Sequence, residues 1–357
     1  MKNLITKCVF VGLFVGGGVL SAAEAMPQRQ QSYERNECPD SCDCGCKEGK
    51  PCTCEPGGFC GTEVQEGCTE HGVHCYGPSY CPGTCYEAEI CNADGVWLPE
   101  DPVLFRPLIA SPRQITYSVG WRFNDQALVK NVIDVSYGDS VAFYRWCDIG
   151  PWCGQLQIEL EGALWAVFDP LHDSSPLVNA DYYVGVPITY AFDNWAFRLR
   201  GYHISCHIGD EFLLNHPGFD RRNPSAEFLD FYVSTDYTDE IRLYAGVGIV
   251  LAQDESFRCG RSYYEAGMEI RMPRLGFINE CSQVYGMPFF AADFLYQGGM
   301  QRDHINQTYV MGYEWGKLCG LQRKLRLFIE YHDGYSVEGQ FCCLPTNYFS
   351  IRMSYGF

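Results

Sequence analysis

The stretch Tyr202–Glu211 holds the side chains best suited to chemistry. His203, Ser205 and His207 occupy alternate positions, and Asp210 follows them. In a strand, residues i and i+2 share a face, so an imidazole would stand beside a hydroxyl. A histidine can deprotonate such a serine when a carboxylate orients its ring. The catalytic candidates are therefore Ser205, His203, His207 and Asp210, and the carboxylates within reach are Asp210, Glu211, Glu227 and Asp230.

Other interpretations of this stretch stay open. A bulge at Gly201 would turn His203 and Ser205 to the opposite face. The strand could also have left a membrane by that point, so that both residues lie on a wet rim. Cys206 could instead be a disulfide partner. His203 and His207 would stand roughly 13 Å apart on a strand, too far to share an ion, and we expect no metal or cofactor.

The strand that would position such a site belongs to a longer alternating pattern, seen most clearly in the last eleven residues. One face holds Phe349, Ile351, Met353, Tyr355 and Phe357, and the other is mainly polar. A closing strand of an outer-membrane barrel faces lipid on one side and a polar lumen on the other. The terminal Phe357 resembles the signal by which bacterial barrel assembly machinery recognises its clients.

About twelve strand signals of barrel-like length follow one another after residue 113. They predict an all-β fold, an antiparallel transmembrane barrel of about 12 strands, preceded by an irregular cysteine-rich segment. The expected strands are 114–122, 132–145, 154–168, 181–192, one from 195, 226–235, 241–251, 263–272, 288–298, one through 309–315, one through 325–331, and 347–357.

In this barrel, His203 and Ser205 share their parity with Trp195, Phe197 and Leu199, the side expected to face lipid. An H-x-S on the outer wall resembles outer-membrane phospholipase A and lipid A deacylase sites. That resemblance implies a serine attacking an ester of a neighbouring lipid. The sequence departs from the pattern, since Cys206-His207 stands where Asn-Gly commonly follows.

The first residues predict export. Lys2 and Lys7 precede an apolar run, and Ala23-Glu24-Ala25 is an A-x-A cleavage site. The expected divisions are a signal peptide over 1–25, a cysteine-rich periplasmic segment over 26–97, a linker over 98–113 and a barrel over 114–357. The apolar run is too short for a spanning helix.

Cysteine dominates the second division. The predicted mature chain keeps twenty cysteines, and twelve of them precede residue 92 among Gly, Pro, Glu and Thr. Such a segment cannot bury a core, so disulfides are expected in an exported chain. The disulfide candidates are Cys38, Cys42, Cys44, Cys46, Cys52, Cys54, Cys60, Cys68, Cys75, Cys81, Cys85, Cys91, Cys147, Cys153, Cys206, Cys259, Cys281, Cys319, Cys342 and Cys343. Soft-metal binding is the alternative, but paired C-x-x-C knuckles are absent.

Charge and topology limit the partners. The net charge of −18 argues against nucleic acid, and lipid is the expected neighbour. With an even number of strands, both ends lie on the periplasmic side of the outer membrane. Cys147, Cys153, Cys281 and Cys319 would then lie at the periplasmic end of the barrel, and Cys206, Cys259, Cys342 and Cys343 at the outer end.

Two runs carry a family resemblance. Phe105–Gln114 resembles the entry motif of the domain of unknown function 1207, and Tyr202–Glu211 is similar to its polar mid-barrel stretch. The resemblance covers roughly 98–357 and implies an outer-membrane-type barrel without an assigned activity. The cysteine tract lies outside it and resembles disulfide-crosslinked envelope proteins of Gram-negative bacteria.

Three functions follow as hypotheses. The first is a structural envelope protein whose cysteine-rich arm forms crosslinks, to itself or to other cysteine-rich envelope proteins. The second is a lipid hydrolase that uses Ser205 and His203. The third is a narrow pore, since about twelve strands leave little bore once side chains fill it.

Overall fold

The computed structural model describes residues 95–99, 103–257, 260–278, 284–298, 304–316 and 323–357, and the backbone of the short strands β1 (His74–Cys75) and β2 (Cys85–Tyr86). The expected signal peptide lies outside the described residues, as does nearly all of the cysteine-rich segment. The other strands are β3 (Val96–Trp97), β4 (Tyr117–Phe123), β5 (Asn131–Ile149), β6 (Gly154–Phe168), β7 (Leu177–Phe192), β8 (Trp195–Ile208), β9 (Ala226–Asp236), β10 (Ile241–Gln253), β11 (Ser262–Arg271), β12 (Phe277–Ile278), β13 (Val284–Gln297), β14 (Asn306–Gly316), β15 (Lys324–Tyr335) and β16 (Pro345–Gly356).

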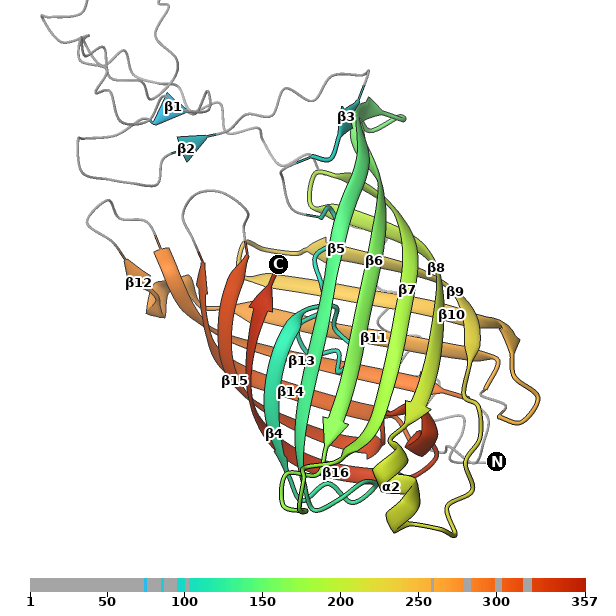
Figure 1. Ribbon diagram of the computed structural model, residues 1–357. Helices are drawn as coiled ribbons and strands as arrows, with labels where there is room; N and C mark the ends of the chain where they lie inside the picture. The colour runs from blue at the N-terminus through green and yellow to red at the C-terminus, as the bar shows by residue number, and fades with distance from the viewer. Residues whose placement is uncertain are drawn as a thin grey trace, which may run out of the picture. The chain divides into compact units, whose positions relative to one another are not determined.

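Twelve of these strands close into an antiparallel barrel (Figure 1). From β4 to β11 and from β13 to β16 each strand pairs with the next, and β11 pairs with β13. The last strand returns to the first, with Tyr355 opposite Tyr117. Strand β3 lies against β5, and β12 against β13. Closure leaves no long free edge, and the predicted 12-strand barrel is confirmed.

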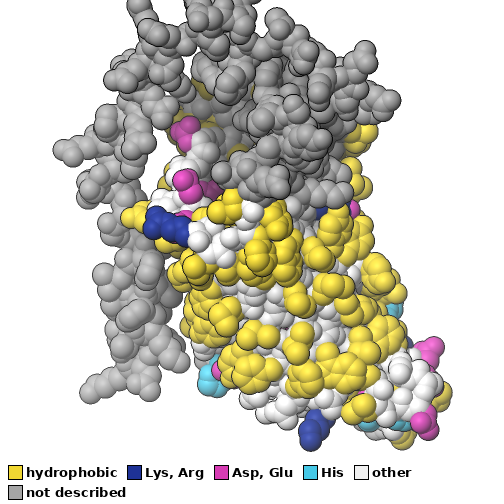
Figure 2. All heavy atoms as spheres, turned by 90° about the vertical axis from the view of Figure 1, so that its left-hand side faces the viewer, with side chains coloured by type: hydrophobic (Ala, Val, Ile, Leu, Met, Phe, Trp, Pro, Cys, Tyr) yellow, Lys and Arg dark blue, Asp and Glu magenta, His cyan; other side chains and the backbone are white. Residues whose placement is uncertain are grey.

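The wall alternates as the sequence pattern predicts. In β10, Val247 and Ile249 are exposed on the outside, whereas Arg242 and Tyr244 are buried inside. Figure 2 shows one face, on which hydrophobic side chains cover much of the wall and charged side chains gather toward its ends. An apolar outer wall with a polar interior is the pattern of membrane-spanning barrels.

The barrel has two unlike ends. The C-terminal rim carries the end of β16 and the short turns 150–153, 193–194 and 237–240. The long-loop rim carries the loops 169–176, 209–225 and 336–344, together with helix α2 (Asp210–Asn215). The remaining helical turns are η2 (Pro273–Leu275) and η3 (Gly339–Phe341). None of the helices described is long and apolar enough to cross a membrane.

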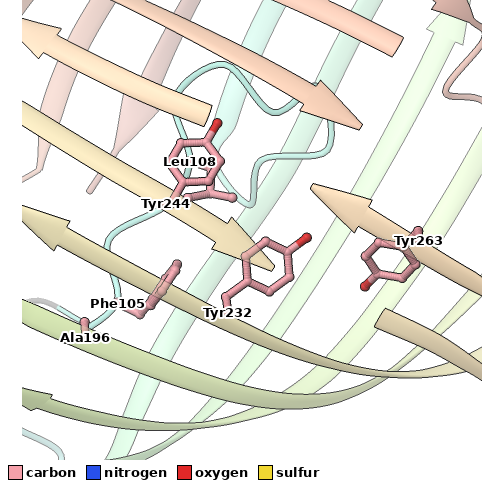
Figure 3. Packing of buried hydrophobic residues seen from close by; sticks show 6 residues of the cluster. All are labelled: Phe105, Leu108, Ala196, Tyr232, Tyr244 and Tyr263. Atoms are coloured by element: carbon pink, nitrogen blue, oxygen red, sulfur yellow. The ribbon is translucent and has the colours of Figure 1, made fainter. Parts of the chain in front are cut away.

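Residues 103–116, the lumenal segment, lie inside the barrel rather than leading up to it. Phe105 and Leu108 pack with the inward rings of Tyr232 and Tyr244 (Figure 3). The first wall strand begins at Tyr117, three residues later than expected. The apolar side chains of this segment are buried against the inner wall. The segment therefore occupies part of the lumen, where the sequence pattern predicted only side chains of the wall strands.

Hydrogen bonds fix the lumenal segment at several depths. Near the C-terminal rim, Arg106 pairs with Asp236, and Arg242 donates to the Arg106 and Pro107 carbonyls at 2.8 and 3.1 Å. Midway, the Ile109 N–H donates to Glu269 at 3.0 Å. These bonds satisfy backbone groups that would otherwise be buried without partners.

The loop 336–344 covers the long-loop rim. Arg113 of the lumenal segment pairs with Asp181 and donates to the Val337 carbonyl, and Glu338 pairs with Arg122 at 2.9 Å. Burial alone would raise the pKa of the Glu338 carboxyl, but the guanidinium of Arg122 outweighs it and holds that pKa below its usual range. Ion pairs thus hold the lumenal segment to the wall near both rims of the barrel, through Arg106 at one rim and Arg113 at the other.

Candidate functional site

Strand β8 keeps its predicted parity along its whole length. It pairs with β7 from Trp195 to Ile208 without a register shift, and Gly201 lies opposite Val186. A bulge at Gly201 is therefore excluded. His203, Ser205 and His207 face outward, while Tyr202 and Cys206 face the lumen.

The structure brings a carboxylate to His203. Glu227 on β9 is its direct register partner, and His203 Nδ1 lies 3.2 Å from Glu227 Oε1. An ionised carboxylate can only accept, so in the neutral imidazole Nδ1 carries the hydrogen and Nε2 keeps its lone pair. Sequence reasoning included Glu227 among four carboxylates but could not select it, because strand register is a tertiary property.

Ser205 lies two residues along the same outer face and opposite Tyr182 of β7. It is half-buried, and no described residue forms a hydrogen bond with its hydroxyl. The other ring nitrogen, Nε2, is the one that accepts the proton when a histidine acts as the base for a serine nucleophile. A rotamer change would have to bring the Ser205 hydroxyl to it, as is common in sites without substrate.

The two remaining candidates do not join this pair. His207 is exposed, and its ring meets the edge of Tyr182 at 5.3 Å between centroids. Asp210 begins α2, beyond the end of β8, and is exposed. Glu227, rather than Asp210, is thus the carboxylate that contacts His203, because it projects from the neighbouring strand at the same level.

The site lies at the margin of the apolar wall. Val184 and Tyr182, the register partners of His203 and Ser205, are about half exposed on the outside. One strand away, Phe231 is also exposed. Toward the long-loop rim the wall gives way to His207 and α2. The hydroxyl and the imidazole therefore stand where apolar surface meets polar loops.

The described cysteines divide into different states. Cys147, near the C-terminal rim, is disulfide-bonded. Cys153, in the adjoining turn, is an exposed thiol. Cys206 is a buried thiol that donates to Asn179 Oδ1 at 2.9 Å. Cys153 and Cys206 are thus free thiols within this chain, and their pairing with a cysteine of another chain stays a prediction. Cys206 faces the lumen, where Asn179 accepts the hydrogen bond from its thiol.

Among the described residues, no group of three or more His, Cys, Asp or Glu side chains is arranged to hold a metal ion.

A family model described as "Protein of unknown function (DUF1207)" matches residues 65–357. This chain belongs to the DUF1207 family. The match takes in the whole barrel, the lumenal segment and part of the cysteine-rich segment. No curated protein matches the sequence.

Solved structures similar to this DUF1207 protein are outer-membrane barrels of low identity. Outer membrane phospholipase A from Escherichia coli is 12% identical over 67% of this chain and 92% of its own, with a TM-score of 0.46. LpxR from Salmonella typhimurium is 10% identical over 68% of this chain and 100% of its own, with a TM-score of 0.36. The NanC porin is 13% identical over the same shares, with a TM-score of 0.35. These likenesses concern the barrel fold alone.

Proposed function

We propose that this DUF1207 protein is an outer-membrane lipid hydrolase that cleaves acyl esters at Ser205. The hydrogen bond between His203 Nδ1 and Glu227 Oε1, on the outer wall beside Ser205, carries the proposal. It supplies the orienting carboxylate of a Ser–His–acid arrangement from a neighbouring strand.

The reaction follows from these three groups. His203 Nε2 takes the Ser205 proton as the oxygen attacks the lipid ester carbonyl, and the same proton then passes to the departing alcohol. Water, deprotonated by His203, attacks the resulting acyl-serine and releases the fatty acid. Glu227 stabilises the imidazolium that forms in both steps.

The position of the site favours lipid as substrate. Lipid ester linkages lie between the hydrocarbon and the headgroups, and His203 and Ser205 stand between exposed apolar wall residues and the polar long-loop rim. A polar pair at this level is also far cheaper than one at the bilayer midplane. A lipid in the adjacent leaflet would present its ester without leaving the membrane.

The test is fatty-acid release from phospholipid vesicles and from lipid A by the purified, folded barrel. We expect Ser205→Ala to lower the rate by on the order of 10³-fold or more. Ser174→Ala, in an exposed loop of the same rim, is the matched control and should leave the rate unchanged. Full activity in Ser205→Ala would refute the assignment.

A second candidate function is envelope crosslinking by the cysteine-rich segment. The exposed Cys153 thiol lies at the C-terminal rim beside the disulfide-bonded Cys147. Strand β3, at the end of the cysteine-rich segment, pairs with the same stretch of β5, Val96 opposite Arg145. A thiol so placed is available to another cysteine-rich protein on that side of the membrane.

A further inference from the structure

Arg198 differs from the other lumenal arginines described. Arg200 pairs with Asp230 at 2.6 Å, and Arg242 pairs with Glu269 at 3.2 Å. Arg198 is only 6% exposed, its Nε is buried without a hydrogen-bond partner, and no described carboxylate forms an ion pair with it. The buried carboxylate of Glu159 interacts with its charge, but from beyond ion-pair distance. A buried charge without an ion-pair partner is unusual because its desolvation is only partly compensated.

Aromatic rings take the place of a counter-ion. The Arg198 guanidinium lies over Phe105 of the lumenal segment at 4.4 Å and over Tyr232 at 4.8 Å from the ring centroids. Cation–π attraction offsets part of the desolvation, but it leaves the N–H donors without acceptors. These N–H donors are suited to a hydrogen-bond acceptor on a bound ligand, since no described residue supplies one.

A cavity lies beside this guanidinium. It has a volume of about 260 Å³, and its lining includes Arg198, which places it just below the roughly 300–1,000 Å³ of sites for drug-sized ligands. Its lining is rich in aromatic rings, among them those of Phe105, Tyr202, Phe228 and Tyr232. The space therefore suits a small molecule with a flat apolar body.

The acidic side chains of the lining are already engaged. Tyr183 donates to Glu161 at 2.6 Å, Tyr232 donates to Glu265, and Tyr244 donates to Asp293 at 2.7 Å. None of them pairs with Arg198. They do, however, make the lumen unfavourable for a ligand with two negative charges, such as inorganic phosphate.

We propose that the lumen binds a small aromatic monocarboxylate, whose carboxylate pairs with Arg198 and whose ring packs between the lumenal segment and the tyrosines of β8 and β9. A carboxylate accepts two parallel N–H bonds from a guanidinium, which compensates the buried charge. This site faces the lumen and is separate from Ser205, which faces outward.

The test measures the Tm of the folded barrel in detergent with benzoate, benzyl alcohol or inorganic phosphate. We expect a saturable rise in Tm with benzoate and no rise with benzyl alcohol or phosphate. Arg198→Gln should abolish the benzoate effect, whereas Arg222→Gln, in an exposed loop, should keep it. No benzoate effect in the wild type, or an equal effect of benzyl alcohol or phosphate, would overturn the proposal.

Stability without ligand gives a second measurement. Because no described carboxylate forms an ion pair with Arg198, Arg198→Met should leave the unliganded Tm unchanged or higher, whereas Arg200→Met should lower it by stranding Asp230. If Arg198→Met lowers the Tm as much as Arg200→Met, the guanidinium has a structural role and the ligand site is rejected. Heat-modifiable migration on gels confirms that each variant is folded.

Discussion

At the scale of single residues, the arrangement around Ser205 depends on which carboxylate meets His203. Asp210 is close in sequence but starts α2, whereas Glu227 is 24 residues further along and lies directly opposite His203. Cross-strand partners approach to about 5 Å between Cβ atoms, which places Glu227 within hydrogen-bond distance. Local sequence proximity was a poor guide to the partner of this histidine.

This difference gives a prediction for the two acids. Glu227→Gln should lower fatty-acid release by roughly 10- to 100-fold, since the amide can still accept from Nδ1 but cannot stabilise the imidazolium as a carboxylate does. Asp210→Asn should leave the rate within about 2-fold of the wild type, because Asp210 lies outside the constellation. The reverse order of effects would assign the orienting role to Asp210.

At the scale of elements, the lumenal segment decides whether the barrel can conduct. Its Pro107 and Pro112 prevent a regular strand or helix, so it crosses the lumen as an irregular chain held by Arg242, Glu269 and Asp181. Glycines of β10 make room for the rings that it meets: a Cβ at Gly246 would overlap the ring of Tyr232. The segment therefore obstructs the lumen and leaves the cavity beside Arg198 in place of a continuous bore.

Conductance in planar bilayers tests this closure. The wild type should be silent or nearly so, because the segment and the loop 336–344 block passage through the lumen. Replacing residues 106–112 by a Gly/Ser stretch of equal length should open a conductance, since flexible glycines leave Arg242 and Glu269 without their backbone partners. Large channels in the wild type would show that the segment does not close the barrel.

At the scale of the whole molecule, the barrel carries two of its cysteines, Cys147 and Cys153, at the C-terminal rim. Cys147 lies near the end of β5 and Cys153 in the turn from β5 to β6, and β3 pairs with this part of β5. Because the number of strands is even, the start of β4 and the end of β16 both lie at this rim, on one side of the membrane. We propose that the exposed Cys153 thiol at this rim is a point of covalent attachment.

Gels of envelopes, with thiols trapped by alkylation during lysis, test the attachment. Without reductant the wild type should run partly as high-mass species, and with reductant as one band. Cys153→Ser should reduce the high-mass fraction, whereas Cys206→Ser should not, since Cys206 is buried in the lumen. Migration as a monomer in both conditions would exclude intermolecular crosslinks.

The sequence by itself determined the wall. Alternation of period 2 gives the strand count, and the parity of β8 gave the outward direction of His203 and Ser205, because a pleated strand places alternate side chains on opposite faces whatever its neighbours are. In β6, the expected bounds 154–168 are those of the structure. The wall strands and the turns between them could be predicted from the sequence because their signals come from neighbouring residues in the chain.

Only the tertiary structure decided what fills the lumen and what meets across strands. The apolar residues Phe105, Leu108 and Ile109 looked like part of a linker, since nothing local shows that a barrel will close around them. The choice of Glu227, the unpaired Arg198 and the buried Cys206 likewise depends on register and closure. Such contacts join residues far apart in the chain, and their geometry exists only once the last strand pairs with the first.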